Sequence, residues 1–404
     1  MQKNSYWIIV IAALGYFVDI YDLILFNVVK EASLKSIGIV GEAFMQYEIV
    51  LFNWQMFGML LGGLLWGILG DKRGRVSVLF GSIVMYSLAN IANGLVQSID
   101  QYIVCRFIAG IGLAGELGAG ITLVSETMHK DKRGIGTMII VSFGALGAVA
   151  AAFVGKHFDW STAYYIGGGL GLALLALRAG AFESGMYSAL HNQKTISRGN
   201  FWILFKQKQR AVLYLKSIAI GIPIWFMIGV LINLSPRFVH IEGLSDSALV
   251  GTAVMFAYIG LSAGDVLSGL LSQWLKSRKK VIGLYLFLSA ALVCWYLYVP
   301  VTSLEAFKWM CFLLGFGTGY WALFVQVASE NFGTNIRSTV TNTVPNFVRG
   351  SVVLSTLAFK RLSVGMPVAE AAAIVGFCCL GLALWALLGM QETFSKDLNY
   401  HEID

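Results

Sequence analysis

Long apolar runs separated by short polar segments repeat along the whole of this 404-residue chain. We count twelve such runs, at residues 6–29, 47–69, 76–97, 102–125, 134–155, 161–182, 211–233, 248–272, 281–299, 305–328, 338–359 and 367–391. Each run has about the 20 residues that an α-helix needs to cross the hydrocarbon core of a bilayer. A transmembrane β-barrel would instead show short segments of alternating polarity. The pattern therefore predicts an all-α membrane protein with twelve transmembrane helices.

Composition and charge agree with this prediction. The chain is 57% hydrophobic and only 13% charged, whereas ordinary globular domains carry about 25% charged residues. Most Lys and Arg residues lie in every second connection, such as 72–75, 130–133 and 276–280. Because cytoplasmic loops are rich in these residues, we expect both termini in the cytoplasm, and the short loops favour a bacterial inner membrane. The net charge of +7 is scattered over these loops rather than gathered in one patch, so we expect contact with the lipid bilayer and no nucleic acid.

The chain divides into two related halves. Its longest polar stretch separates six runs from six runs, so we expect an N-terminal six-helix bundle at residues 1–182, a cytoplasmic linker at 183–210 and a C-terminal six-helix bundle at 211–404. Glu126 is followed by Arg133, and Glu330 is followed at the same spacing by Arg337. Paired repeats of this kind are typical of transporters whose substrate binds near the bilayer midplane, between the two repeats.

Motifs in the first half resemble those of one family. The connection after the second run reads G-I-L-G-D-K-R-G-R from Gly67 to Arg75, which closely resembles the loop signature G-x-x-x-D-R/K-x-G-R of the major facilitator superfamily. The fourth run, from Arg106 to Glu116, is similar to the R-x-x-x-G-x-x-x-G-G-E signature of metabolite:proton symporters and of sugar and phosphate porters, but Ala114 replaces one Gly of the pair. The resemblance implies two pseudo-symmetric six-helix bundles that work by alternating access.

Two shorter elements extend this resemblance. Asp19 and Asp22 stand in D-I-Y-D, which is similar to the E/D-x-Y-D element of the first helix in the symporter branch. Arg178 and Glu183 resemble the R-x-x-x-x-E-S/T signature after the sixth helix, although the Pro usual after it is Gly185 here. The resemblance thus covers the whole chain, with its most specific motifs in the first half.

The resemblance gives the connection after the second run a role in gating. Gly permits tight turns and close helix approach, and an acid such as Asp71 can pair with a nearby Arg or with a helix N-terminus. We expect a cytoplasmic latch that stabilises one conformation, formed by Gly67, Asp71, Arg73, Gly74 and Arg75. In the second half Gln273 stands at the position equivalent to Asp71, so a second latch should be weaker. The alternative is a positively charged turn that only orients the chain.

Charged residues inside apolar runs are expensive in a membrane and mark transport paths. Asp19 and Asp22 share one helix face, and the helical rise places Asp22 and Arg106 at similar depths, so that they could pair. Related porters use such a pair for proton coupling. We therefore predict that Asp22, paired with Arg106, is the main proton-linked group and that Asp19 and Glu116 assist it. The alternative is a static ion pair between the first and fourth helices.

Arg349 lies near the middle of the eleventh run, where it shares a helix face with Asn342 and Asn346. Its planar guanidinium suits a carboxylate or a phosphate. We expect this face to bind substrate, whereas the alternative is a pairing of Arg349 with a buried acid such as Asp265. Nearby candidates are Trp321, Tyr320 and Gln326 of the tenth run, whose preceding glycines should let that helix bend. Further cavity candidates are Asn27, Asn53, Gln55, Trp225, Asn233 and Tyr258.

These observations predict a secondary active transporter that imports a small polar metabolite, a carboxylate or an amino acid, together with protons. The alternatives are a proton-coupled exporter or antiporter, and an importer of a larger polycarboxylate such as an iron chelator. A sensor is disfavoured because no large soluble segment is present, and an enzyme because the runs contain no catalytic or nucleotide-binding motif. No Cys/His spacing suggests a metal site. We therefore expect no metal and no cofactor, and a monomer whose partners are its substrate, the proton and lipid.

Overall fold

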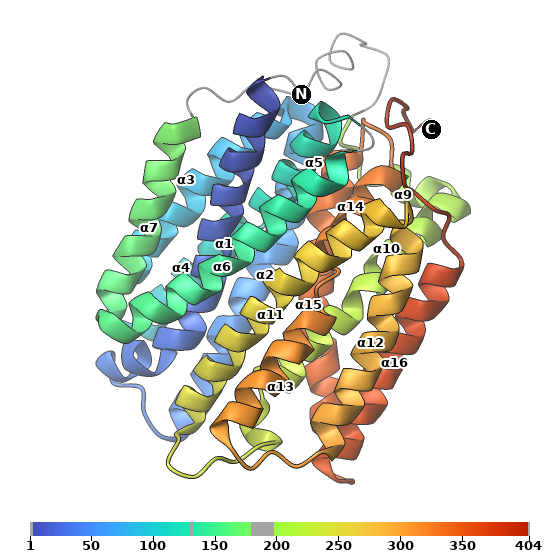
Figure 1. Cartoon of the computed structure of the whole chain (residues 1–404). Coiled ribbons are helices and arrows are strands. Elements are labelled where there is room, and N and C mark those ends of the chain that lie inside the picture. The colour runs from blue at the N-terminus through green and yellow to red at the C-terminus, as the bar shows by residue number, and fades with distance from the viewer. Residues whose placement is uncertain (1–2, 130–131, 179–197, 403–404) are drawn as a thin grey trace.

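The helices run side by side through one bundle, and the N- and C-termini lie at the same end of it (Figure 1). We call this end the terminal side. The computed structural model describes residues 3–129, 132–178 and 198–402. Glu183, Gly185 and most of the predicted linker lie outside the described residues, so their predicted roles stay predictions.

Each half of the chain forms a bundle of six spans, some of which consist of two consecutive helices. The first contains α1 (Lys3–Ser36), α2 (Glu42–Arg73), α3 (Arg75–Asn93), α4 (Ile99–Leu113), α5 (Glu116–Thr127), α6 (Arg133–His157) and α7 (Trp160–Leu177). The second contains the short α9 (Ile203–Lys206), α10 (Lys208–Phe226), the π-helix η2 (Met227–Ile232), the 3-10 helix η3 (Ser235–Arg237), α11 (Asp246–Trp274), α12 (Arg278–Tyr298), α13 (Leu304–Gly317), α14 (Trp321–Asn331), α15 (Arg337–Leu362) and α16 (Val368–Leu388). The bundles meet chiefly where α2 packs on α15 and α6 packs on α11.

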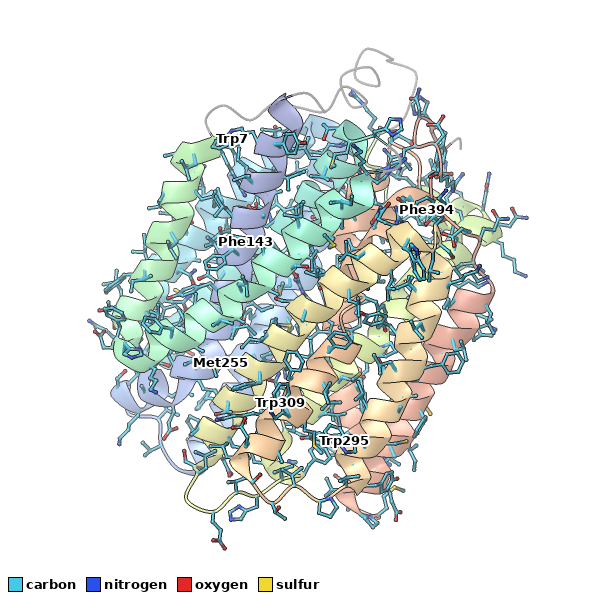
Figure 2. All side chains as sticks on the ribbon, in the orientation of Figure 1. Trp7, Phe143, Met255, Trp295, Trp309 and Phe394 are labelled. Carbon is cyan, nitrogen blue, oxygen red and sulfur yellow. The ribbon has the colours of Figure 1, made fainter. Side chains whose placement is uncertain are left out.

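The helices fit a membrane by length and polarity. Within the described residues, eleven helices are long and apolar enough to cross a bilayer. The eleventh predicted span, α15, is not among these. It is long enough, with 26 residues, but it carries many polar side chains, and these are buried inside the protein, where such groups are tolerated. Trp7 and Trp309 are exposed near opposite ends of the bundle (Figure 2), as expected for aromatic residues at the two membrane interfaces.

Two of the spanning helices are broken at equivalent places in the two halves. The tenth span stops at Gly317 and resumes at Trp321, in the glycine-rich part that was expected to let the helix bend. A methyl group on Gly319 would lie 2.4 Å from the backbone of Gly264, so glycine allows this break to pack directly on α11. The fourth span, predicted to be continuous over residues 102–125, also breaks, between Leu113 and Glu116.

The chain after α16 returns over the terminal side and caps another helix. The carboxylate of Glu392 accepts hydrogen bonds from the backbone N–H groups of Arg278 (3.0 Å) and Lys279 (3.2 Å) and from the Ser277 hydroxyl, at the start of α12. Phe394, labelled in Figure 2, lies 5.0 Å from the Arg278 guanidinium. Burial alone would raise the pKa of Glu392, but these hydrogen bonds outweigh it and lower the pKa.

Replacing Glu392 with Ala is expected to lower the free energy of unfolding by about 1 kcal/mol, the usual loss for a helix cap. Because the folded-state pKa is depressed, the stabilisation is present above the unfolded value of about 4.3 and is lost as pH falls through the folded value. The melting temperature in detergent, measured at a series of pH values, should therefore be lower for the Ala variant near neutral pH. The values for the variant and the unmodified protein should converge in acid. Glu392→Gln keeps one acceptor oxygen and should lose less; a difference that persists unchanged in acid would contradict this account.

Candidate functional site

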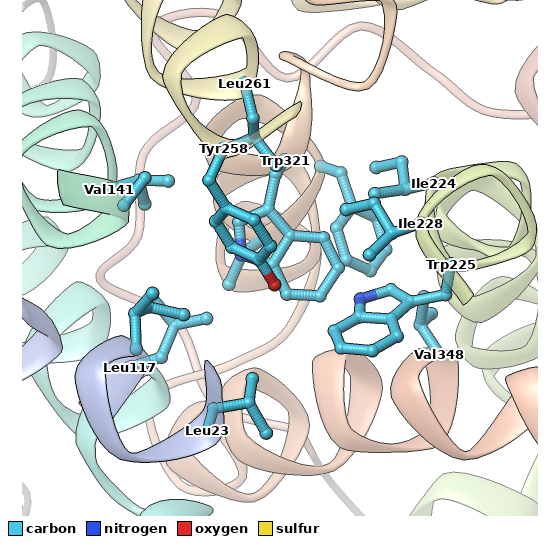
Figure 3. Packing of buried hydrophobic residues seen from close by; sticks show 14 of the residues in the cluster. Leu23, Leu117, Val141, Ile224, Trp225, Ile228, Tyr258, Leu261, Trp321 and Val348 are labelled. Atoms are coloured by element: carbon cyan, nitrogen blue, oxygen red, sulfur yellow. The ribbon is translucent and has the colours of Figure 1, made fainter. Parts of the chain in front are cut away.

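A small pocket lies between the two bundles, within the membrane-spanning part of the protein. It is lined by Tyr16, Ile20, Ala145, Ile224, Trp225, Ile228, Tyr258, Leu261, Trp321 and Arg349. These residues come from α1 and α6 of the first half and from α10, η2, α11, α14 and α15 of the second. Figure 3 shows the rings of Trp225, Tyr258 and Trp321 converging on one space. The pocket therefore has aromatic and aliphatic walls and one charged lining residue, Arg349.

Arg349 is held between aromatic rings with part of its donor capacity unused. Its guanidinium carbon lies 6.0 Å from the ring centre of Trp225 and 5.6 Å from that of Trp321. One of its N–H groups donates to the side-chain oxygen of Asn346 at 3.1 Å, while its Nε has no hydrogen-bond partner, although the residue is 1% exposed. Stacking on aromatic faces fixes the plane of a guanidinium and leaves its edge available for a planar anion. The alternative pairing with Asp265 is wrong, since that acid bonds to the backbone N–H of Ala322.

A hydrogen bond closes one side of the pocket across the two bundles. The indole N–H of Trp321 donates to the Tyr16 hydroxyl at 3.0 Å. Trp225 and Tyr258 were sequence candidates and do line the pocket, whereas Tyr16 and the aliphatic lining residues were missed. The available signal for Tyr16 was its position three residues before Asp19, on the same helix face.

Asp19 lies beside this pocket and is fully buried. Neither of its carboxylate oxygens has a hydrogen-bond partner. The charged groups near enough to act on it are Arg349 and Arg178, which attract its carboxylate, and Glu116 and Asp22, which repel it. Asp19 therefore lies within electrostatic reach of Arg349, the one cation of the pocket lining, without a hydrogen bond to it.

The predicted ion pair between Asp22 and Arg106 is not formed in this structure. Arg106 donates to the side-chain oxygen of Gln55 and lies over the ring of Phe26 at 4.7 Å. The Asp22 carboxylate lies near the side chains of Asn90 and Arg106 but forms no hydrogen bond of regular geometry with either. It faces α7 so closely that a methyl group on Gly167 would lie 2.6 Å from it. Asp22 is thus enclosed within the first bundle and is not part of the pocket.

Glu116 is also committed to the interior of the first bundle. It forms an ion pair with Arg178 at 2.6 Å and accepts a hydrogen bond from Ser82 at 2.7 Å. Because both ends of the pair are buried, breaking it would leave an uncompensated charge. This geometry favours a structural role for Glu116, which joins α5 to the end of α7, over a role in proton transfer.

The remaining predicted substrate residues support the pocket or lie away from it. Asn346 donates to the backbone oxygen of Ala114 at 3.1 Å and so joins α15 to the break in the fourth span. Asn342 packs against Gly118 of α5 at the bundle interface. Tyr320 donates to the backbone oxygen of Ile220 at 3.0 Å, and Gln326 donates to Glu330 at 2.8 Å. Of the six residues predicted to bind substrate, only Arg349 and Trp321 line the pocket.

The two bundles are joined on the terminal side by Asp71. Its carboxylate accepts from the backbone N–H groups of Ser338 (3.0 Å) and Thr339 (2.8 Å) and from the Thr339 hydroxyl (2.7 Å), so a residue of α2 caps α15 of the other half. A methyl group on Gly67 would lie 2.8 Å from the Cα of Thr339. Gly74 turns the chain between α2 and α3 at φ +103°, a conformation that favours glycine. Arg73 is exposed and lies outside these contacts.

Buried ion pairs reinforce this closure. Glu126 pairs with Arg75 at 2.9 Å within its own half and with Arg337 of the other half at 3.0 Å. On the other side Glu330 pairs with Arg278 at 3.1 Å and lies 3.9 Å from Arg133 of the first half. Together with Asp71 we call these residues the terminal-side network. It closes the terminal side, so a path from the pocket to that side requires its separation.

The model of the Major Facilitator Superfamily matches residues 12–352. The chain belongs to this superfamily.

Relatives of this chain are named as transporters of small metabolites. It is 26% identical over 350 residues to the 3-(3-hydroxy-phenyl)propionate transporter of Escherichia coli, with 85% of each chain covered. It is 26% identical over 311 residues to the niacin transporter of Acinetobacter baylyi, with 70% of each chain covered. The proton:xylose symporter XylE, solved with 6-bromo-6-deoxy-D-glucose, shares the fold with a TM-score of 0.77 at 16% identity, over 98% of each chain. The protein is therefore a multi-pass membrane transporter of a small metabolite and not an enzyme.

Replacing Asp71 with Ala is expected to increase the fraction of molecules that are open on the terminal side. The change removes three hydrogen bonds and leaves the first turn of α15 without its cap, a loss of about 1–3 kcal/mol in the closed state alone. A cysteine at Thr122, which is fully buried between the bundles, should then react about tenfold faster with a water-soluble maleimide, since 1.4 kcal/mol is a factor of ten in an equilibrium. Asp71→Asn keeps an acceptor and should react at an intermediate rate. An unchanged rate in the Ala variant would remove Asp71 from the latch.

The second half has no equivalent acid in this position. Gln273 of α11 approaches the start of α6, where a methyl group on Gly134 would lie 2.4 Å from its side-chain nitrogen. That nitrogen has no hydrogen-bond partner. Gln273 carries no charge, so it interacts with the helix N-terminus of α6 more weakly than the Asp71 carboxylate interacts with that of α15. This geometry supports the expectation that the second latch is weaker.

Proposed function

We propose that this transporter imports a small aromatic monocarboxylate together with a proton. The observation that carries the proposal is the Arg349 guanidinium, which is stacked near Trp225 and Trp321 in the pocket and has an unpaired Nε. The carboxylate of such a substrate can bind the edge of this guanidinium, while the aromatic ring of the substrate packs among the indole and phenol rings of the pocket.

The lining narrows the substrate class. Arg349 is the only cation among the lining residues, which favours one carboxylate group over a polycarboxylate such as an iron chelator. No acid is among the residues that line the pocket, and Asp19 beside it is assigned to the proton in this proposal, which favours a monocarboxylate over an amino acid. Two relatives carry names of aromatic carboxylates, 3-(3-hydroxy-phenyl)propionate and niacin, which supports the same class.

The proton belongs, in this proposal, to Asp19 rather than to Asp22, the residue first expected from the sequence. When ionised, Asp19 attracts Arg349 and competes with a substrate carboxylate for it. Protonation of Asp19 removes this competition, so Arg349 is free to bind the anion. In the loaded transporter the substrate anion then neutralises Arg349, and no unpaired charge remains in the core. The two bundles can therefore rotate against each other until the terminal-side network separates. Substrate and proton leave together because the ionised Asp19 again attracts Arg349.

The side of release follows from charge. The connections at the terminal side carry most of the Lys and Arg residues, so we propose that this side faces the cytoplasm of a bacterial inner membrane. One chain supplies the whole lining of the pocket, and we propose that it works as a monomer.

Uptake into proteoliposomes tests the proposal with paired ligands. Nicotinate and nicotinamide differ in charge but share a ring, while benzoate and cyclohexanecarboxylate differ in ring planarity but share the carboxylate. We expect accumulation of the two aromatic carboxylates under an inward proton gradient, with much weaker uptake of nicotinamide and cyclohexanecarboxylate. Preference for the neutral amide would reject the role of Arg349, and uptake that ignores the gradient would reject symport.

A further inference from the structure

A second buried acid, Asp265, is not used by the transport mechanism proposed above. It lies on α11 and is fully buried. One carboxylate oxygen accepts the backbone N–H of Ala322 at 2.9 Å, and the other has no hydrogen-bond partner. Lys216 of α10 donates to the backbone oxygen of Gly389 at 3.0 Å rather than to this acid. Among the described residues, Asp265 therefore has a helix N-terminus as its partner rather than a cation.

The break in the tenth span explains why an acid is needed there. When a helix restarts inside the membrane, the N–H groups of its first turn require acceptors. The residue before α14, Tyr320, provides no side-chain cap. Gly319 and Gly264 pack so closely that a methyl group on either would meet the other's backbone at 2.4–2.9 Å. This contact brings Asp265, the next residue of α11, to the first turn of α14, where its negative charge also suits the helix dipole.

The capped turn contributes a residue to the pocket lining. Trp321 is the first residue of α14. Its indole N–H bonds to Tyr16 across the bundles, and its ring lies 5.6 Å from the Arg349 guanidinium. If the first turn of α14 loosened, Trp321 would lose a fixed orientation toward both residues.

We propose that Asp265 is a positioning residue for substrate binding, which holds the first turn of α14 so that Trp321 keeps its place in the pocket. It acts through the oxygen that caps the turn and does not carry the transported proton. The fourth span shows the contrast: the acid at the start of α5, Glu116, is paired with Arg178, so in that half the acid at the break serves an ion pair. The link to uptake depends on the aromatic carboxylate proposal, whereas the link to α14 does not.

Two variants separate the cap from the charge. Asp265→Asn keeps the capping oxygen and removes the charge, and Asp265→Leu removes both at similar volume. Hydrogen–deuterium exchange of the purified protein should show faster exchange in peptides that contain residues 321–324 for the Leu variant, with α13 peptides unchanged, and near-normal exchange for the Asn variant. This readout needs no substrate. If the Leu variant does not fold, Asp265→Ala carries the same expectation without added bulk.

Transport kinetics complete the test. For the best aromatic carboxylate, the KM of the Leu or Ala variant should rise about tenfold while its maximal rate changes little, the size of effect typical of one lost cap. The Asn variant should keep both its KM and its proton-driven accumulation. Normal exchange in the first turn of α14 in a folded Leu or Ala variant would overturn the proposal. So would loss of proton-driven accumulation in the Asn variant, because the charge rather than the cap would then matter. Absence of uptake by the unmodified protein would reject the substrate class and leave the exchange result to decide on Asp265.

Discussion

Replacing Arg349 with Gln is expected to reduce uptake of an aromatic carboxylate at least about 100-fold at low substrate concentration. A charge-assisted pair of hydrogen bonds to a carboxylate contributes about 1.5–3 kcal/mol for each bond, and the pocket lining offers no second cation to replace it. Arg349→Lys keeps the charge but loses the planar group that lies near Trp225 and Trp321. Its uptake should therefore fall by about tenfold rather than recover.

The same helix supplies a matched control. Arg361 lies on α15 and is exposed, so Arg361→Gln removes the same charge without reaching the pocket. Initial rates of nicotinate and nicotinamide uptake, measured for both variants, separate charge recognition from folding. Only Arg349→Gln should lose the preference for the charged ligand. A preference that survives in this variant would show that the carboxylate binds elsewhere.

Arg349 could be predicted from the sequence because the energetic cost of its position does not depend on the tertiary structure. A cation in the middle of a spanning helix is costly wherever the helix packs, and the burial of Arg349 among aromatic rings follows from that cost. Asp71 could be predicted because its loop motif is specific. Its two expected partners were a nearby Arg and a helix N-terminus, and the structure shows both, Arg75 at 3.4 Å and the start of α15. The twelve apolar runs likewise reflect the thickness of a bilayer and need no knowledge of tertiary contacts.

The error over Asp22 and Arg106 has a different origin. Sequence spacing gives the depth of a residue along its helix, but it does not give the rotation of one helix against another. In the folded bundle α2 brings Gln55 to Arg106, and Asp22 turns toward α7. Two charges at equal depth therefore meet other neighbours. The role of Tyr16 was missed for a related reason, since an aromatic residue in an apolar run has the same appearance in a pocket, a core or a lipid-facing surface.

Contacts between distant, irregular segments left no periodic signal at all. Arg133 donates to the backbone oxygen of Lys396 at 2.8 Å, and Arg337 donates to that of Leu398 at 2.7 Å. Every residue has a backbone oxygen, so no pattern in the sequence predicts these hydrogen bonds. The repeat of Glu126 with Arg133 and Glu330 with Arg337 was visible, but the exchange of partners between the halves, Arg337 with Glu126 and Arg133 near Glu330, required the structure.

Replacing Asp19 with Asn is expected to abolish proton-driven accumulation while sparing exchange of substrate across the membrane. Asn cannot take up and release a proton, but it leaves Arg349 free of its competing charge. Accumulation under an inward proton gradient should therefore fall to the level of an equilibrating carrier, whereas counterflow between labelled and unlabelled substrate should stay within about threefold of the unmodified protein, since removal of the competitor costs little binding energy.

Asp22→Asn is the matched control, because it makes the same change on the same helix, three residues along. Asp22 is enclosed in the first bundle against α7 and is separate from the pocket lining, so this variant should still accumulate substrate in response to the gradient. Both variants are measured in proteoliposomes with the same internal buffer, and intravesicular pH is followed during uptake. If Asp19→Asn accumulates substrate normally and Asp22→Asn does not, the proton is carried inside the first bundle and Arg349 recognises substrate without taking part in the coupling.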